Sequence, residues 1–222
     1  MLQARNINKS YTSGGVHLPV LSNVSLQLSR GELVAVTGAS GVGKSTLLHI
    51  LGTLDRPSEG RLQITETDVL DLPDDDLAEF RNKHIGFVFQ FHNLLPEFTA
   101  IENVMLPAMI AGRSIPDIRD KAVDLLARVG LQPRLHHRPG ELSGGECQRV
   151  AVVRALVMEP TIVLADEPSG NLDDETSQRL HDMIVELARS EKQTFLIMTH
   201  DHELAARFDR SGRIEQGRLH FN

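Results

Sequence analysis

A glycine-rich segment, GASGVGKS at positions 38–45, constrains the fold of this chain more strongly than any other part of its sequence. It matches the pattern G-x-x-x-x-G-K-[ST], and it lies between an apolar run at 32–36 that predicts a strand and a run at 46–51 that predicts a helix. A plain turn would match the pattern by chance in roughly one chain in a hundred of this length, and the two flanks lower that chance. Glycines let backbone N–H groups converge on an anion, and the dipole of the following helix adds to the attraction. The segment therefore predicts a phosphate-binding loop.

The polar side chains of this loop predict that the anion is a nucleotide bound with magnesium. Lys44 offers a positive charge to the outer phosphates, and Ser45 offers a hydroxyl to Mg²⁺. We therefore expect ATP and Mg²⁺ as cofactors. The residues expected to contact ATP are Gly38, Ala39, Ser40, Gly41, Val42, Gly43, Lys44, Ser45 and Thr46.

Two adjacent carboxylates, Asp166 and Glu167, follow an apolar run at 161–165. Adjacent acids at the end of a strand could simply be solvated, but a phosphate-binding loop in the same chain favours a catalytic role. Asp166 is then the candidate magnesium ligand, and Glu167 is the candidate base that polarises the attacking water.

Four short apolar runs predict the buried strands of a parallel sheet. They cover residues 32–36, 85–89, 161–165 and 194–198, and the candidate residues that follow them are Gly38, Gln90, Asp166 and His200. Since the carboxyl ends of parallel strands share one edge, we expect these four residues to converge on one phosphate. Gln90 is placed to reach the metal or the attacking water, and His200 to hydrogen-bond the terminal phosphate. Taken alone, each residue is better explained as a satisfied buried side chain, and only their shared position at matching strand ends favours the functional role.

The remaining patterns predict an α/β fold with two additions to the parallel sheet. Alternating segments at 2–7 and 20–28, separated by turn-forming residues at 12–15, predict an N-terminal antiparallel β layer. Between residues 97 and 159 the apolar spacing becomes helical, which predicts an α-helical subdomain inserted into the sheet domain. The clearest helical spacing covers 118–129 and 147–158, and the prolines expected to interrupt the block are Pro107, Pro116, Pro133 and Pro139.

A second candidate anion site lies in the segment LSGGE at 142–146. Ser143 followed by Glu146 fits a capping box at the start of a helix. A cap does not require the two glycines Gly144 and Gly145, however, and bare N–H groups at a helix N-terminus attract anions. We therefore expect the segment to be both a cap and an anion site.

Composition limits the partners and the compartment. A net charge of -7 disfavours nucleic-acid binding, and the single cysteine, Cys147, excludes an intrachain disulfide and fits a reducing compartment. No apolar run of about eighteen residues is present, and residues 1–11 lack the apolar core of a secretory signal. We therefore expect a cytosolic protein without a membrane span.

Taken together, these motifs resemble the nucleotide-binding domains of ABC transporters over nearly the whole chain. The resemblance identifies GASGVGKS as the Walker A motif, Gln90 as the Q-loop, LSGGE as the signature, IVLADE as Walker B, residues 169–173 as the D-loop and His200 as the switch histidine. It implies one RecA-like P-loop NTPase domain over 1–222, with a nucleotide-binding core at 1–90 and 160–222 and a helical subdomain at 91–159. It also implies that Tyr11 stacks on adenine, although a lone aromatic could equally be packing.

The resemblance further implies a head-to-tail homodimer with two ATP molecules between the subunits. Ser143, Gly144, Gly145, Glu146 and Asp173 would then contact the ATP held by the partner chain. Transmembrane permease subunits of the LolC/LolE kind would dock on residues 91–107, so the chain would meet the cytoplasmic face of the inner membrane only through partners. The exposed apolar character of FHNLLPEF suits such a surface.

Within the family, QFHNLLPEFTAIENVMLP and EPSGNLD resemble the MacB/LolD-type branch. The lack of a following membrane domain favours a separate lipoprotein-releasing ATPase over a MacB-like fused exporter, and an FtsE-like regulator that does not transport remains the alternative. Soluble ABC ATPases of translation or DNA repair carry two cassettes or a large insertion, for which 222 residues leave no room. Cys147 stands where the branch has a polar residue, and either a lowered thiol pKa or a tolerated small side chain would fit there.

Overall fold

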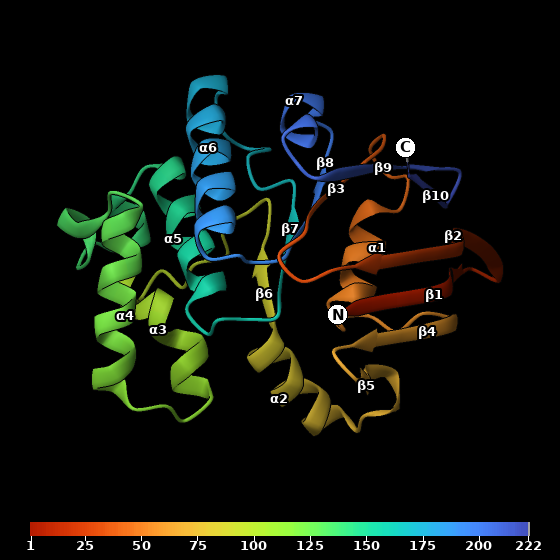
Figure 1. Cartoon of the computed structure of the whole chain (residues 1–222), viewed down its shortest axis with the longest axis horizontal. Coiled ribbons are helices and arrows are strands. Elements are labelled where there is room, and N and C mark those ends of the chain that lie inside the picture. Colours follow the sequence, from red (N-terminus) through yellow and green to blue (C-terminus); the bar gives the residue numbers. More distant parts are fainter. Residues whose placement is uncertain (222) are drawn as a thin grey trace.

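The computed structural model describes residues 1–221 and contains a central six-stranded sheet with the order β10-β9-β3-β8-β7-β6 (Figure 1). Its strands are β3 (Leu33–Thr37), β6 (Ile85–Val88), β7 (Ile162–Asp166), β8 (Phe195–Thr199), β9 (Arg210–Glu215) and β10 (Arg218–Phe221). All neighbours pair in parallel except β10, which is antiparallel to β9. The four apolar runs predicted as strands are therefore the four adjacent parallel strands β3, β8, β7 and β6. The predicted parallel core is confirmed.

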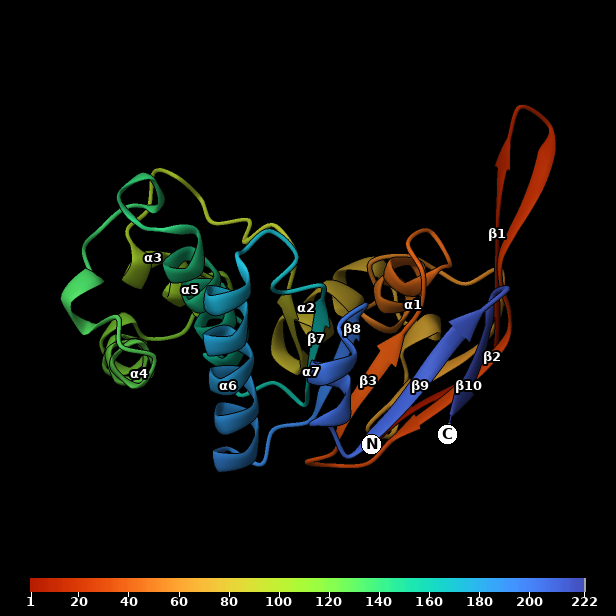
Figure 2. The same ribbon diagram turned by 90° about the horizontal axis from the view of Figure 1, so that it is seen from above.

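A second sheet of four antiparallel strands lies beside the first, in the order β2-β1-β4-β5. Its strands are β1 (Leu2–Ser13), β2 (Val16–Leu28), β4 (Glu59–Ile64) and β5 (Thr67–Asp68). The turn predicted at 12–15 is shorter than expected, because Gly14 and Gly15 alone turn the chain with φ of 58° and 82°. Two positive φ angles suit a two-residue hairpin turn, so both strands continue to it. Figure 2 shows the β1–β2 hairpin projecting beyond the rest of the molecule.

Helices cover both faces of the central sheet. They are α1 (Lys44–Leu51), α2 (Asp74–His84), α3 (Ala100–Ile110), α4 (Ile115–Arg128), α5 (Gly144–Leu156), α6 (Asp174–Ser190) and α7 (His202–Ala206), with 3-10 turns at Val69–Asp71, Gln132–Arg134 and Pro139–Glu141. Helices α3, α4 and α5 pack on one another at the far side of α6 from the antiparallel sheet (Figures 1 and 2). Within residues 1–221, no helix combines the length and the apolar character needed to cross a membrane.

One proline was wrongly expected to interrupt the helical block. Pro107 lies inside α3, where its carbonyl accepts hydrogen bonds from Asn82 Nδ2 at 3.1 Å and from Ala111 N at 3.2 Å. Proline has no N–H, so α3 loses only the hydrogen bond to the carbonyl four residues earlier, and Pro107 O still accepts the bond that continues the helix. Pro116 begins α4, where proline is favoured, and Pro133 and Pro139 lie in the short 3-10 turns.

The central sheet separates two apolar cores. On β3, Leu33 and Ala35 face the helices α3 to α6, whereas Val34 and Val36 face α1 and the antiparallel sheet. Burial on both faces explains why these strands read as continuous apolar runs rather than as alternating ones. It also fixes the carboxyl ends of the parallel strands along one edge of the sheet.

Candidate functional site

The carboxyl ends of β3, β6, β7 and β8 border a cavity of about 700 Å³. Gly38 follows β3, Gln90 lies two residues after β6, Asp166 ends β7 and His200 follows β8. The structure thus brings the four predicted residues to one edge, although only Gln90 and His200 line the cavity itself. The other lining residues are Val20, Ser40, Gly41, Gly43, Lys44, Ser45, Thr46 and Glu167.

The loop before α1 has the backbone geometry of an anion nest. Gly43 has φ of 109°, and a Cβ there would lie 3.0 Å from Leu21 Cδ2 and 3.2 Å from Val20 Cγ1. Glycine is therefore required where the loop meets the helix. Helix α1 begins without a side-chain cap, so its first N–H groups remain available to a ligand on the cavity side.

Lys44 is buried beneath this loop. Its Nζ donates hydrogen bonds to the carbonyls of Gly38 at 2.8 Å and Ala39 at 3.2 Å, and it lies 3.3 Å from Glu167 Oε1. Only 8% of the Lys44 side chain and 16% of the Glu167 side chain are exposed, so water screens the charge pair little. The ammonium group is thus held at the inner wall of the cavity.

Glu167 is also held from the opposite side. Its Oε2 accepts a hydrogen bond from His200 N at 3.2 Å and lies 2.8 Å from His200 Nδ1. Glu167 has φ of 44°, a left-handed conformation that is strained for a non-glycine residue and common at functional sites. The carboxylate therefore lies between a lysine and a histidine at the cavity wall, with its orientation fixed.

Asp166 is the residue whose surroundings fit a magnesium ion. Its Oδ1 is buried without a hydrogen-bond partner. Burial raises the pKa of this carboxyl, and the Ser45 side chain lies close enough to lower the pKa in part. A cation beside Oδ1 would satisfy the unpaired oxygen, and a carboxylate with a hydroxyl supplies the oxygen donors that Mg²⁺ prefers. Among residues 1–221, no group of three or more His, Cys, Asp or Glu side chains is arranged to hold a metal.

Gln90 is joined to residues 169–173 by Asn171, which sequence reasoning did not single out. Asn171 Nδ2 donates a hydrogen bond to Gln90 O at 3.1 Å, and Gln90 Nε2 donates a long one to Asn171 Oδ1 at 3.4 Å. A Cβ on Gly170 would lie 2.9 Å from Gln90 Nε2, so glycine permits the approach. The two loops therefore form one wall beside the cavity.

The segment LSGGE starts α5 with the capping box predicted from the sequence. Ser143 N donates to Glu146 Oε2 at 2.8 Å, and Glu146 N donates to Ser143 Oγ at 3.2 Å. A Cβ on Gly145 would lie 2.5 Å from Thr176 Cγ2, so this glycine also permits α5 to pack on α6. None of the residues 143–146 lines the 700 Å³ cavity, and neither does Asp173, which caps α6 through Thr176 N at 3.0 Å. The structure thus does not bring these predicted contacts to the cavity of their own chain.

Cys147 is not an activated thiol. It is 2% exposed, and its Sγ donates to Pro139 O at 3.5 Å. Burial, with a smaller contribution from Glu146, raises the thiol pKa rather than lowering it. Of the two interpretations considered from the sequence, the tolerated small side chain fits and the lowered pKa is wrong.

Tyr11 lies outside the cavity but close to its rim. Its hydroxyl donates to Asp55 Oδ2 at 2.9 Å, and burial together with Asp55 raises the pKa of Tyr11. Lys9 Nζ lies 4.8 Å from the ring centroid and 2.7 Å from Asp55 Oδ1. These contacts fix a ring that remains 42% exposed. An adenine base could therefore still stack on it.

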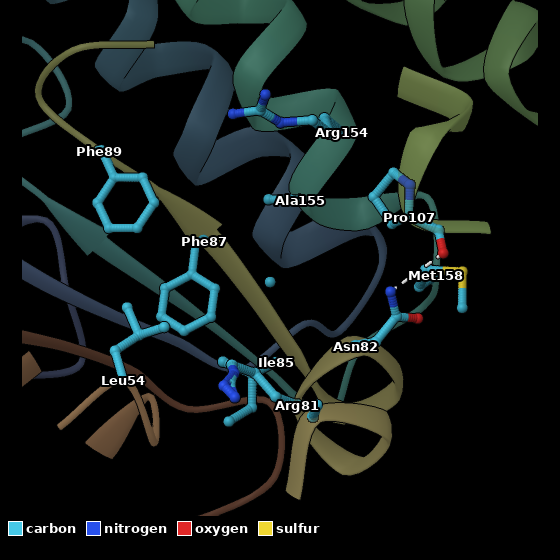
Figure 3. A pocket seen from close by; sticks show the side chains of 12 residues that line it. Leu54, Arg81, Asn82, Ile85, Phe87, Phe89, Pro107, Arg154, Ala155 and Met158 are labelled. Carbon is cyan, nitrogen blue, oxygen red and sulfur yellow. Dashed lines mark hydrogen bonds between the residues drawn. The ribbon is translucent and has the colours of Figure 1, made fainter. Parts of the chain in front are cut away.

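A second hollow, of about 390 Å³, lies between α2, β6, α3 and α5 (Figure 3). Its lining includes Leu54, Phe87, Phe89, Pro107 and Met158, with the Phe87 and Phe89 rings stacked at 5.5 Å. Asn82 Oδ1 beside it is buried without a hydrogen-bond partner. The family resemblance predicts a docking surface at residues 91–107, and the hollow lies beside that segment.

Helix α5 holds the chain between the cavity and the hollow. Gln148 Nε2 donates to Phe89 O at 2.8 Å, and the Arg154 guanidinium donates to His92 O and Asn93 O, both at 2.7 Å. These contacts tie residues 89–93 to the helix that begins at LSGGE. Neither side chain was singled out in the sequence, because both contacts join residues about sixty positions apart.

Comparison with known proteins points to one family. Residues 21–170 match the family model described as ABC transporter. The chain is 51% identical over 219 residues to the "Lipoprotein-releasing system ATP-binding protein LolD" of Geobacter metallireducens, covering 99% of this chain and 97% of the relative. The protein of the same name from Porphyromonas gingivalis is 52% identical, covering 99% and 98%.

Solved structures agree with these relatives. An ATP-binding cassette solved as a dimer in a post-hydrolysis state bound to ADP and Pi superposes with a TM-score of 0.90 at 38% identity, covering 99% of this chain and 96% of that one. A second dimeric structure, described as a bacterial ABC transporter cassette, has the same TM-score at 39% identity and the same coverage. The predicted fold class is therefore confirmed.

Proposed function

Because this chain belongs to the ABC transporter family, we propose that it is the ATP-hydrolysing subunit that drives release of lipoproteins from the inner membrane through a separate transmembrane partner. The observation that carries this proposal is identity near 50% with relatives named for lipoprotein release, over almost their whole length. ATPase activity coupled to transport follows from the family itself. Residues 1–90 and 160–222 would form the nucleotide-binding core, and 91–159 the helical subdomain.

The geometry of the cavity supports a hydrolytic mechanism. ATP phosphates bind the N–H groups of residues 38–46 and the ammonium of Lys44. The Glu167 carboxylate orients a water molecule and accepts its proton as the water attacks the terminal phosphate, while His200 keeps that carboxylate in place and reaches the phosphate. Asp166 and Ser45, with Gln90 nearby, would hold Mg²⁺, which neutralises charge on the phosphates when bound.

The position of LSGGE supports a working homodimer. Residues 143–146 and Asp173 lie away from the cavity of their own chain, although the first turn of α5 has the N–H groups of an anion site. In a head-to-tail dimer these residues contact the ATP bound to the partner, and closed twofold symmetry completes both sites. A dilute single chain would then be a poor ATPase, because half of each site is missing.

The hollow of Figure 3 and the adjoining residues 91–107 support a permease as the membrane partner. Phe91 is 69% exposed and Leu54 is 47% exposed, and exposed apolar side chains beside an apolar hollow are typical of a surface that binds a protein partner. Permease subunits of the LolC/LolE kind would bind here and place the chain at the cytoplasmic face of the inner membrane. Gln148 and Arg154 would pass the movement of the docked segment to α5.

Cross-linking from the docking surface tests the partner. A photo-reactive amino acid replaces Phe91 in cells, and the captured membrane protein is identified by mass spectrometry. Capture of a lipoprotein-release permease is expected. Capture of a cell-wall regulator would support the FtsE-like alternative. Capture of a MacB-like exporter would mean that the transported substrate is not a lipoprotein. The same substitution at Lys192, which is exposed at the opposite edge of the sheet, controls for nonspecific capture.

A further inference from the structure

A buried histidine on α6, His181, joins two loops that carry candidate site residues. It is 2% exposed, and its Nε2 lies 2.7 Å from the Ser169 hydroxyl. Its Nδ1 lies 3.6 Å from Oδ2 of Asp201, the residue that follows His200. The mechanism above gives this polar side chain no role, and burial of a polar group requires partners.

These contacts close a ring around Glu167. Ser169 follows Glu167 by two residues, and Asp201 follows His200 directly. His200 lies 2.8 Å from Glu167 Oε2 through its Nδ1. From Glu167 the ring therefore runs through Ser169, His181, Asp201 and His200 and returns to the same carboxylate. His181 is thus the side chain that connects the two loops.

The orientation of the imidazole follows from the acceptor that it faces on the Asp201 side. An ionised carboxylate can only accept, so the imidazole N–H faces Asp201 and Nε2 accepts the proton of the Ser169 hydroxyl. Burial lowers the pKa of His181, against the attraction of Asp201 and Asp182 and with the help of Arg207, which favours the neutral ring that this arrangement needs.

One contact of the ring is longer than the others. The 3.6 Å between His181 and Asp201 exceeds a hydrogen-bond length. Asp201 itself is fixed, because its Oδ1 accepts from Leu204 N at 2.9 Å and its N donates to Thr199 Oγ1 at 3.0 Å. Ser169 is fixed at its carbonyl, which accepts from Ser177 Oγ at 3.4 Å. Because both neighbours are anchored, a shift of either loop changes its contact with His181.

We propose that His181 is a positioning residue that couples residues 169–173 to His200, so that displacement of residues 169–173 by the second subunit changes how His200 holds Glu167. The inference rests on the roles proposed above for Glu167 and His200. It adds a path by which the partner chain, which would contact Asp173, acts on the catalytic carboxylate of this chain.

The test compares His181→Phe, which keeps an aromatic ring without polar atoms, with His181→Gln, which keeps a donor and an acceptor. Steady-state ATP hydrolysis with Mg²⁺ is measured for both variants at chain concentrations high enough for the proposed dimer to form. We expect His181→Phe to lower kcat about tenfold with KM for ATP within about twofold, and His181→Gln to recover most of that loss. His84→Phe is the matched control, since His84 Nδ1 lies 2.9 Å from Thr161 Oγ1 at the opposite edge of the sheet.

A second pair of variants separates positioning from folding. Ser169→Ala removes one hydroxyl and should lower kcat several-fold without lowering the melting temperature by more than about 2 °C. On a His200→Ala background, His181→Phe should reduce the residual rate by less than about twofold, because its effect passes through His200. The proposal would be overturned if the kcat losses of His200→Ala and His181→Phe multiplied fully in the double variant. It would also be overturned if the kcat loss of His181→Phe matched a drop in melting temperature and His181→Gln did not restore it.

Failure of this inference is distinguishable from failure of the proposed function. If Glu167→Gln abolishes turnover and His200→Ala leaves only a low residual rate, while His181→Phe hydrolyses ATP like the parent, only the coupling through His181 is wrong. If Glu167→Gln itself turns over ATP at the parental rate, the proposed catalytic roles are wrong, and the coupling is wrong with them.

Discussion

Lys44 Nζ lies 3.3 Å from Glu167 Oε1, so the residue proposed to bind phosphate is paired with the residue proposed to activate water. Both side chains are largely buried, and Lys44 also donates to two carbonyls of its own loop. A bound phosphate competes for the same ammonium group. Binding of ATP would therefore draw Lys44 toward the phosphates and leave Glu167 free to accept a water proton, which links catalysis to substrate binding.

Lys44→Ala should weaken nucleotide binding itself. Charge-assisted hydrogen bonds contribute about 1.5–3 kcal/mol each, so the affinity for ATP should fall about ten- to a hundredfold. Titration with a fluorescent ATP analogue measures the loss. Lys192→Ala, at an exposed lysine on the opposite edge of the sheet, should bind like the parent. Unchanged affinity in Lys44→Ala would show that the loop does not hold the phosphates.

Glu167→Gln should retain ATP binding but stall hydrolysis and accumulate dimer. The amide preserves shape while removing the proton acceptor, which predicts a loss of about a hundredfold or more in kcat. Phosphate release and light scattering with ATP measure the two effects, and Glu186→Gln on the exposed face of α6 serves as control. Turnover at the parental rate would show that Glu167 is not the base.

Asp166→Asn should raise the Mg²⁺ concentration needed for half-maximal turnover by about 10- to 100-fold, because the carboxylate charge that favours the cation is lost. The same change should not lower the free energy of unfolding, since burial already disfavours the charged form and leaves Oδ1 without a partner. Mn²⁺ binding measured by electron paramagnetic resonance with a nonhydrolysable ATP analogue provides an independent readout. Parental Mn²⁺ affinity would exclude Asp166 from the metal site.

The sequence predicted the parallel core well, because each of β3, β6, β7 and β8 is buried and reads as an apolar run. It did not predict β9 and β10. The β9 sequence RSGRIE alternates buried and exposed positions, and β10 forms the open edge of the sheet, so neither shows the continuous apolar signal. The antiparallel pairing of β4 with β1 was likewise missed, since EGRLQI has only two buried positions.

The candidate site divides in the same way. Motifs with fixed local spacing, such as residues 38–45 and 142–146, could be predicted from the sequence because their geometry depends on residues that are close together in the chain. Asn171, Arg154 and His181 were not, because each acts through a partner on another element. Gln90 and Asn171 are 81 positions apart, and no local pattern records that they touch.

Gly145→Ala should destabilise the protein, whereas Gly144→Ala should not. A Cβ at Gly145 would lie 2.5 Å from Thr176 Cγ2, but a Cβ at Gly144 meets only Leu172 Cδ2 at an ordinary 3.4 Å. Overpacking of this kind costs about 1–3 kcal/mol, while alanine in the first turn of a helix costs nothing. Urea unfolding measures both variants. Equal free energies of unfolding for the two variants would show that α5 and α6 can move apart without loss of stability.

Cys147 should react slowly with thiol reagents as long as the chain is folded. Its burial keeps reagents out and raises its pKa, so little thiolate forms at neutral pH. Alkylation at pH 8 should be about 100-fold slower than in the guanidinium-unfolded chain, because it needs local opening.

The sign of the pH effect on stability follows from the raised pKa of Cys147. The folded thiol keeps its proton to higher pH than the unfolded one, so this contribution to the free energy of unfolding is complete below about pH 8.5 and is lost as the pH rises further. Cys147→Ala should remove that pH dependence, and alkylation of the folded parent at the unfolded rate would contradict the buried, inert thiol.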